Sequence, residues 1–282
     1  DGRYENAVSA LREITSEYGL IKYRYIIEIK WFIHLSKNPQ IKELPKLDIK
    51  DYLYLNDLIG NFDIKDAKRV KTIEKKTNHD VKAIEYFIRE KFKKHKKLSK
   101  YQEFIHFACT SEDINNLSYA LMIKEAKSIT KAAINETNKK IKQLANKYKK
   151  ISMLSRTHGQ NASPTTMGKE FANFHHRINK ISLSVDQRTM TGKINGAVGN
   201  YNAHRVAYPE IDWQKISNQF VRSLKLDFNS HTTQIEPKDT IALLLGDYVK
   251  LNNVFIDMSR DIWGYISLGY FKQKLKKGEV GS

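Results

Sequence analysis

The residues best suited to proton-transfer chemistry lie at positions 155–160, which read Ser-Arg-Thr-His-Gly-Gln. His158 carries the side chain type that gives or takes a proton near neutral pH without a large shift of its pKa. The hydroxyl, guanidinium and amide groups beside it could hold a carboxylate or a phosphate. We predict that Gly159 allows a sharp turn in a loop, and that Ser163 and Pro164 cap and start the next helix. The alternative interpretation is a polar surface loop with an exposed histidine.

A second polar segment, residues 77–80, reads Thr-Asn-His-Asp and comes directly before an apolar pattern. Apolar residues at positions 81, 84, 88 and 92 have the spacing of one face of a helix. Capping of that helix explains Asn78 or Asp80, but it leaves His79 without a structural role. Two histidine-bearing segments at helix starts are compatible with a shared site for an anion.

A third polar segment, residues 110–116, reads Thr-Ser-Glu-Asp-Ile-Asn-Asn. Thr110 and Asp113 fit a capping box for a long helix that we predict to reach Tyr148. The two asparagines that follow lie inside the first turns, and helix propensity does not explain them because Asn is a poor helix former.

Two more polar segments interrupt the helical pattern. Residues 191–200 contain three glycines together with Lys193 and Asn195, so this loop could approach a ligand closely or could be a bent connection. Residues 232–237 read Thr-Thr-Gln-Ile-Glu-Pro and predict a polar turn ahead of the last helix.

The elements that would position these segments are long helices. Apolar periodicity predicts helices over residues 16–36, 49–58, 167–185 and 241–265. In the last two, apolar residues recur in steps of four and three, which is typical of a helix-bundle seam. Such seams cannot be buried within one helix, so we predict an all-α fold whose bundle forms between subunits.

Composition limits the class of protein. The chain has 282 residues, 40% of them hydrophobic and 28% charged, which is typical of a globular protein, and no apolar run approaches the roughly 20 residues of a membrane helix. The single cysteine, Cys109, excludes an internal disulfide and agrees with a reducing, cytoplasmic compartment. The net charge of +18 could serve a polyanionic partner, but the lysines are spread along the chain. We therefore expect neither a nucleic-acid partner nor a membrane.

Taken together and in this order, the segments resemble those of the fumarase/aspartase superfamily over essentially the whole chain. The resemblance rests on Asp-Gly-Arg-Tyr at residues 1–4, on residues 77–80, 110–116 and 155–160, on Lys-Ile-Asn-Gly-Ala-Val-Gly at residues 193–199, and on Thr-Thr-Gln at residues 232–234. Each segment alone is a weak signal, whereas their order is specific. The run that ends at His204 is typical of the bacterial-type branch that acts on succinylated purine nucleotides.

The resemblance implies an N-terminal helical domain over residues 1–98 and a long-helix bundle domain over residues 99–282. In the family this bundle forms the core of a homotetramer, and each active site is built from three subunits. The implied reaction is β-elimination of fumarate from adenylosuccinate, giving AMP, and from succinyl-aminoimidazole-carboxamide ribotide, with no metal or organic cofactor. The resemblance also implies that the printed chain stops within a mobile loop, ahead of a C-terminal domain.

The resemblance assigns catalytic roles by position. His158 matches the general acid, His79 matches a second histidine near the phosphate, and Ser282 is the first serine of the loop that supplies the base. Which of the two adjacent serines of that loop acts as the base is left open. The positions expected to bind the substrate are Arg3, Tyr4, Asn78, Asp80, Thr110, Ser111, Thr157, Gln160, Lys193, Asn195 and Gln234.

Three alternatives stay open at this point. A sister lyase, such as argininosuccinate lyase, fumarase or aspartase, would share the central histidine segment and the mobile loop. A non-catalytic helical scaffold of the same superfamily would share the fold, although the presence of both histidines argues against it. A nucleic-acid-binding module would account for the charge alone.

Overall fold

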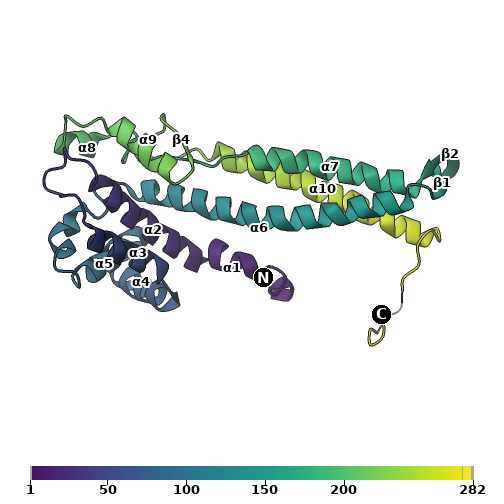
Figure 1. The fold of residues 1–282 in the computed structure, drawn as a ribbon, viewed down its shortest axis with the longest axis horizontal. Coiled ribbons are helices and arrows are strands. Elements are labelled where there is room, and N and C mark those ends of the chain that lie inside the picture. The colour runs from purple at the N-terminus through teal and green to yellow at the C-terminus, as the bar shows by residue number, and fades with distance from the viewer. Residues whose placement is uncertain (1, 275, 281–282) are drawn as a thin grey trace. The chain divides into compact units, whose positions relative to one another are not determined.

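The computed structural model describes residues 2–274 and 276–280, and most of them are helical (Figure 1). The described residues divide into two compact units, which we treat separately. Unit 1 comprises residues 1–130 and 189–240, and unit 2 comprises residues 131–188 and 241–282. This division follows contacts within one chain and does not test the expected domain boundary after residue 98, which stays a prediction.

Unit 1 consists of short and medium helices with one small parallel strand pair. Its elements are η1 (Gly2–Tyr4), α1 (Ser9–Thr15), α2 (Glu17–Leu35), α3 (Ile49–Gly60), α4 (Ile64–Thr77), α5 (Asp80–Phe92), η2 (Leu98–Phe104), the first part of α6 (Ser111–Tyr148), β3 (Thr191–Gly192), α8 (Asn202–Ala207), α9 (Trp213–Ser223) and β4 (Asp227–Phe228). The predictions for residues 16–36 and 49–58 are confirmed within two residues at each end, and α6 ends at Tyr148 as predicted.

The core of unit 1 forms around α2. The Ser16 side chain begins this helix by accepting a hydrogen bond from the backbone N–H of Gly19 at 3.3 Å. Trp31 and Phe32 are fully buried. The Phe32 ring lies edge-on to Phe92 of α5, with ring centres 5.0 Å apart. Packing of α2 against α5 therefore fixes the position of the 77–80 segment, which connects α4 to α5.

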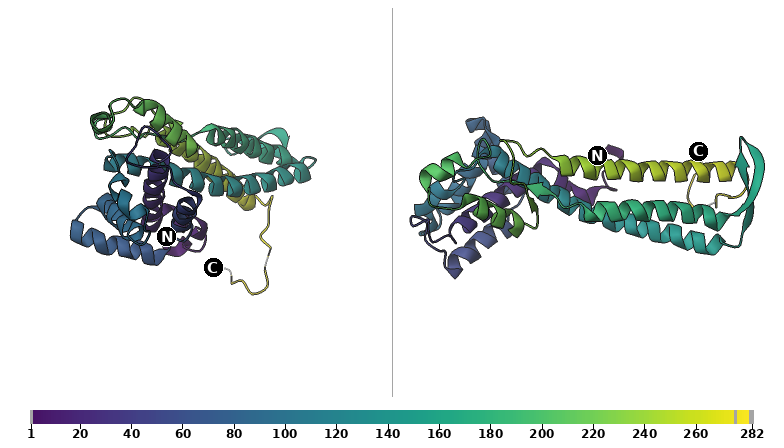
Figure 2. Two further views of the ribbon diagram at one scale, coloured as in Figure 1. Left: turned by 60° about the vertical axis from the view of Figure 1, so that its left-hand side comes forward. Right: turned by 90° about the horizontal axis from the view of Figure 1, so that it is seen from above.

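Unit 2 is built from the second part of α6, from α7 (Met167–Gln187) and from most of α10 (Asp239–Ser267), which lie side by side (Figure 2). The predicted seams contribute to its core, which contains Ile134, Ile141, Ala145, Met167, Phe171, Phe174, Ile178, Leu251 and Val254. Phe255 packs against this core and is partly buried. The helix predictions for residues 167–185 and 241–265 are thus confirmed, while burial of the seams between subunits stays a prediction.

The prediction for residues 155–164 is wrong in its local structure. Residues Ser152–Thr157 and Gln160–Thr166 form antiparallel strands β1 and β2. Pro164 pairs with Leu154 inside this hairpin and does not start a helix. The helix starts at Met167, and its N-cap is Thr166, whose side chain accepts from the N–H of Lys169 at 3.1 Å. The all-α class holds apart from this hairpin and the short β3–β4 pair.

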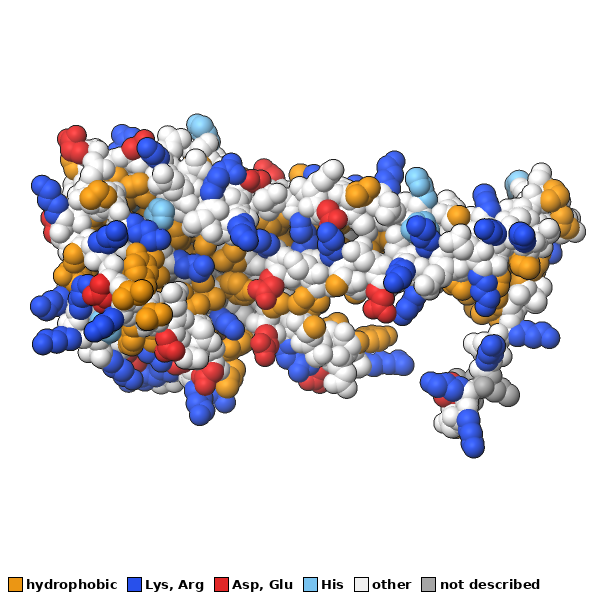
Figure 3. All heavy atoms as spheres, viewed as in Figure 1, with side chains coloured by type: hydrophobic (Ala, Val, Ile, Leu, Met, Phe, Trp, Pro, Cys, Tyr) orange, Lys and Arg blue, Asp and Glu red, His pale blue; other side chains and the backbone are white. Residues whose placement is uncertain are grey.

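Lys and Arg side chains are spread over the visible face of the molecule, across elements of both units, and do not form a single patch (Figure 3). This distribution agrees with the expectation that the charge of +18 is dispersed. Among the described residues, no helix is both long and apolar enough to cross a membrane.

Candidate active site

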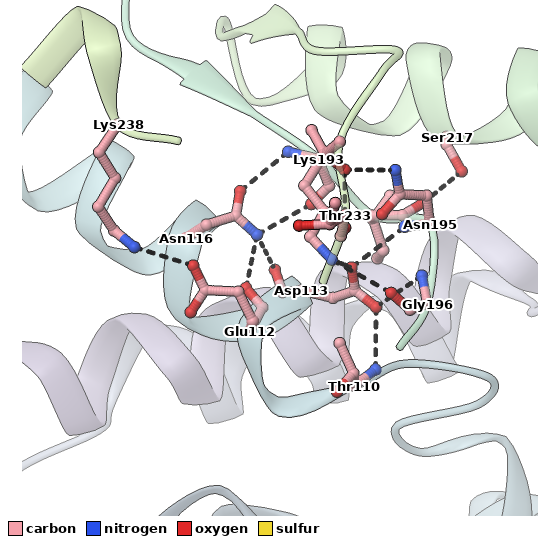
Figure 4. A network of polar contacts seen from close by, with 12 residues as sticks. Thr110, Glu112, Asp113, Asn116, Lys193, Asn195, Gly196, Ser217, Thr233 and Lys238 are labelled. Carbon is pink, nitrogen blue, oxygen red and sulfur yellow. Dashed lines mark hydrogen bonds and ion pairs between the residues drawn. The ribbon is translucent and has the colours of Figure 1, made fainter. Parts of the chain in front are cut away.

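Asp113 is the centre of a buried polar network in unit 1 (Figure 4). Its carboxylate forms an ion pair with the Lys193 ammonium at 2.8 Å, and both side chains are 0% exposed. Among described residues it also accepts hydrogen bonds from the backbone N–H groups of Thr110 (2.9 Å), Asn195 (3.1 Å) and Gly196 (3.1 Å). The first turn of α6 is therefore joined to the glycine-containing loop after β3, as expected for segments of one site.

Asn116 is the second connection between these two segments. Its side chain accepts from the N–H of Lys193 at 2.9 Å and donates to the carbonyl of Lys193 at 3.1 Å. This pairing satisfies both backbone groups of a fully buried residue, which would otherwise cost free energy. The presence of an asparagine at a poor helical position is thereby explained.

The 232–237 segment lies against the same loop. The Asn195 amide donates to the Thr232 hydroxyl at 2.8 Å, and this hydroxyl donates to the Thr233 carbonyl at 3.0 Å. Gly199 has a φ of 81°, and a Cβ there would collide with the Thr232 carbonyl. A glycine is required at this position because the two backbones approach closely. Gln234 itself is exposed.

A second polar chain in unit 1 joins the 77–80 segment to α6. Arg24 is buried on α2, and its guanidinium contacts Asp80 at 2.7 Å and Asn115 at 2.8 Å. Burial opposes ionisation of Asp80, but Arg24 and the N–H of Val81 outweigh it and hold the pKa of Asp80 below its usual value. Sequence reasoning missed Arg24, because a charged residue inside an apolar helical pattern gives no local signal of its partners.

His79 has a structural role that the sequence analysis did not assign to it. The side chain of His79 is the N-cap of α5, since its Nδ1 accepts from the N–H of Lys82 at 3.1 Å. Asn78 is instead the last residue of the preceding turn, in left-handed conformation with a φ of 52°. The His79 side chain is 51% exposed, and its Nδ1 is already used by the cap. This geometry fixes the ring orientation and leaves one nitrogen for a ligand.

The remaining predicted residues of unit 1 differ in exposure. Lys193 and Asn195 are fully buried, and the Lys193 ammonium also lies 3.2 Å from the Gly196 carbonyl. Arg3 and Tyr4 are exposed, and the Arg3 guanidinium lies 6.0 Å from the centre of the Tyr4 ring. Ser111 is the first residue of α6. The structure thus brings the 110–116, 193–199 and 232–234 segments together, and Arg24 connects the first of them to residues 77–80.

His158 lies in unit 2 at the tip of the β1–β2 hairpin. Thr157 pairs with Gln160 as the last pair of the ladder, so His158 and Gly159 form a two-residue turn with φ values of 51° and 74°. Two positive φ angles are typical of the tight turns that match strand twist. The Thr157 hydroxyl and His158 Nδ1 are 3.0 Å apart, and the imidazole is exposed. A hairpin tip with one ring nitrogen held in place can present the other nitrogen for proton transfer.

A cavity of about 350 Å³ lies behind this hairpin within unit 2. Its lining includes Ser155 and Arg156 of β1, Glu170 of α7, and Asp261 and Tyr265 of α10. Burial, together with the charges of Glu170 and Asp257, raises the pKa of Asp261. Side chains of two helices and of the hairpin therefore line the same cavity. Ser282, the predicted base, lies outside the described residues.

Comparison with known proteins places this geometry in a family. An adenylosuccinate lyase from Legionella pneumophila (strain Corby) is 52% identical over 283 residues, covering 100% of this chain and 62% of that protein. Adenylosuccinate lyases from Escherichia coli (strain K12) and Haemophilus influenzae are 51% and 49% identical, again over 100% of this chain and 62% of theirs. The chain therefore spans about 62% of the length of the curated relatives that it matches.

Solved structures with little sequence similarity share the fold. A fumarate lyase from Mesorhizobium sp. BNC1 has a TM-score of 0.75 at 15% identity, over 92% of this chain and 57% of that one. A β-carboxy-cis,cis-muconate cycloisomerase from Acinetobacter calcoaceticus sp. ADP1 has a TM-score of 0.72 at 17% identity, with the same coverage. The sequence family described as "Lyase" matches residues 2–282. The resemblance inferred from the polar segments is thereby confirmed, and the chain belongs to this lyase family.

Proposed function

We propose that the protein to which this chain belongs is an enzyme that eliminates fumarate from adenylosuccinate, giving AMP, and from succinyl-aminoimidazole-carboxamide ribotide. The observation that carries the proposal is the identity of about half of all residues, along the whole chain, to adenylosuccinate lyases from several bacteria. The reaction belongs to purine nucleotide biosynthesis, and the enzyme would work in the cytoplasm.

The chemistry requires an acid, a base and donors for the developing charge. In the proposed mechanism a base removes a carbon-bound proton beside a carboxylate, and an acid protonates the leaving nitrogen. We assign the acid to His158, whose imidazole is exposed at the hairpin tip and hydrogen-bonded through Nδ1. The base is assigned to Ser282, which needs activation from its surroundings because an isolated hydroxyl is a weak nucleophile and base.

Unit 1 would supply the binding surface for the nucleotide. His79 is held by its capping bond and offers its second nitrogen, and Asp80 is held by Arg24. Arg3 is exposed and could bind the phosphate through a bidentate contact. The buried Lys193 and Asp113 would act on the substrate indirectly, by fixing the loop that carries Asn195. The remaining proposed contacts of unit 1 come from Tyr4, Asn78, Thr110, Ser111 and Gln234, and those of unit 2 come from Thr157 and Gln160.

We also propose that the active enzyme is a homotetramer whose active sites are shared between subunits. Support comes from α10, where several large apolar side chains remain exposed on this chain, including Leu245 (57%) and Trp263 (73%). Exposed apolar faces of this extent favour association.

The test uses the full-length protein and three candidate substrates. Turnover of adenylosuccinate, with no turnover of argininosuccinate or malate, is the expected result. Turnover of another substrate would identify a sister lyase, and turnover of none would favour a non-catalytic scaffold. His158→Ala is the matched control, since an exposed hairpin residue can be replaced without loss of the fold.

A further inference from the structure

Beneath the 193–199 loop lies a group of buried polar atoms without partners. Both ring nitrogens of His204, the hydroxyl of Tyr201 and the Oδ1 atom of Asn195 form no hydrogen bond with any residue that the structure describes. His204 and Asn195 are 0% exposed, and Tyr201 is 7% exposed. Most native buried polar groups do have a partner, so a group of this size requires a physical explanation.

These three residues belong to one location. The backbone N–H of Tyr201 donates to the Asn195 carbonyl at 2.9 Å, and the Tyr201 and His204 rings have centres 5.5 Å apart. A Cβ placed on Gly196 would lie 3.8 Å from His204 Nδ1. On another side, the His204 ring packs against Trp213 with ring centres 4.8 Å apart. His204 is therefore enclosed, with an aromatic ring on one side and the loop on another.

Neighbouring side chains are already engaged elsewhere. The Ser217 hydroxyl faces the Tyr201 hydroxyl without meeting hydrogen-bond geometry, and it donates its own proton to the Ile194 carbonyl at 2.7 Å. The Asp113 carboxylate is engaged by Lys193 and by the backbone of the loop. Direct side-chain contacts within this group thus leave the four atoms unsatisfied, and an unsatisfied buried polar group is unfavourable.

The hydrogen-bonding capacity of the group matches that of water. Burial lowers the pKa of His204 to about 4. The nearby charge of Asp113 opposes this shift, and the charge of Lys193 adds to it. The neutral imidazole has one N–H donor and one acceptor nitrogen. Tyr201 adds a donor, because burial raises the pKa of its hydroxyl, and Asn195 Oδ1 adds an acceptor. The group therefore offers two donors and two acceptors, and a water molecule can pair with both kinds. Buried waters typically make about three hydrogen bonds.

We propose that His204, Tyr201 and Asn195 line a buried site for ordered water, and that this water positions the 193–199 loop. His204 is then a positioning residue, which acts on substrate through the orientation of Asn195. The water site itself is independent of the reaction, whereas its effect on catalysis rests on the proposed function. The two parts therefore have separate readouts.

The first readout is a crystal structure of the full-length protein. Ordered water within hydrogen-bond distance of a His204 nitrogen, and also of the Tyr201 hydroxyl or Asn195 Oδ1, is expected. Direct bonds among these side chains, or from Ser217 to Tyr201, with no water present would overturn the proposal. This readout holds even if the enzyme acts on another substrate.

The second readout is a double-mutant cycle on kcat and on Tm. His204→Phe keeps the ring packing against Trp213 and removes both nitrogens, and Tyr201→Phe removes only the hydroxyl. Because both contact the same water, we expect each to lower kcat, by up to about 100-fold if Asn195 is displaced, and the double variant to be no worse than the poorer single variant. Independent, additive losses would contradict a shared water site.

Two further variants keep the cycle interpretable. His204→Gln retains a donor and an acceptor, so it should recover most of the lost Tm and kcat even if His204→Phe folds poorly. Tyr208→Phe is the matched control, because its hydroxyl bonds Glu43 at 2.7 Å away from this group, and its kcat should match wild type. If His204→Gln were as impaired as His204→Phe, ring packing and not hydrogen bonding would be the role of His204.

Discussion

The buried Asp113–Lys193 pair predicts unequal effects of removing its two members. Asp113→Asn removes the opposing charge and leaves the fully buried Lys193 ammonium with neutral acceptors alone, among them the Gly196 carbonyl at 3.2 Å. An uncompensated buried charge costs about 3–5 kcal/mol of unfolding free energy. Lys193→Met leaves the carboxylate with three backbone N–H donors at 2.9–3.1 Å. Since hydrogen bonds to a charged group contribute about 1.5–3 kcal/mol each, the carboxylate remains compensated and this variant should be less destabilised.

The assay is urea unfolding of the full-length protein followed by circular dichroism. All variants are compared at one protein concentration, because association shifts apparent stability. Lys140→Met is the control, since it removes an exposed ion pair with Glu136 and should cost less than about 1 kcal/mol. Equal losses for Asp113→Asn and Lys193→Met, or losses no larger than that of the control, would refute the reasoning.

Three other predictions concern His158, His204 and Arg24. His158→Ala should leave the oligomeric state unchanged and lower kcat by about 100- to 10,000-fold, as expected for loss of a general acid; activity within about threefold of wild type would exclude the role. The folded-state pKa of His204, about 4, lies below the ordinary value of 6.5, so the unfolded chain binds more protons between these values. Unfolding free energy should therefore fall by about 3 kcal/mol as pH drops from 6.5 to 4, and His204→Gln should show a shallower dependence in the same titration; identical slopes would contradict it. Arg24→Met should raise the pKa of Asp80 measured by NMR, and an unchanged value would show that Arg24 does not hold this carboxylate.

The helices could be predicted from the sequence because their signals are local. Apolar residues at helical spacing locate α2 within two residues, and the same pattern gives α7. The β1–β2 hairpin was missed because Ser163-Pro164 is also a common helix start. A turn signal was nevertheless present, since His158-Gly159 takes the positions that Asn-Gly occupies in tight hairpins.

The partners of the site residues could not be predicted in the same way. Asp113 and Thr110 fit a local capping box, and the Thr110 N–H does donate to Asp113. The contact between Asp113 and Asn195, however, spans 82 residues of sequence. Periodicity and capping rules describe neighbours within a few turns, so they assign Asp113 to a cap and cannot assign it to the loop. The resemblance to a family supplied the segments but not the contacts between them.

The residues of the polar segments fall into an exposed group and a buried group, and the two groups have different roles. A residue that transfers a proton must reach the substrate, and His158 and His79 are accessible. An ion pair that fixes a loop is stronger when it is shielded from bulk solvent, because a buried charge pair is screened less than an exposed one. Asp113 and Lys193 meet that condition, with side chains that are 0% exposed. A charge-preserving change such as Lys193→Arg would place a larger side chain at a fully buried position, whereas a change at the exposed His158 would leave the core packing unaltered.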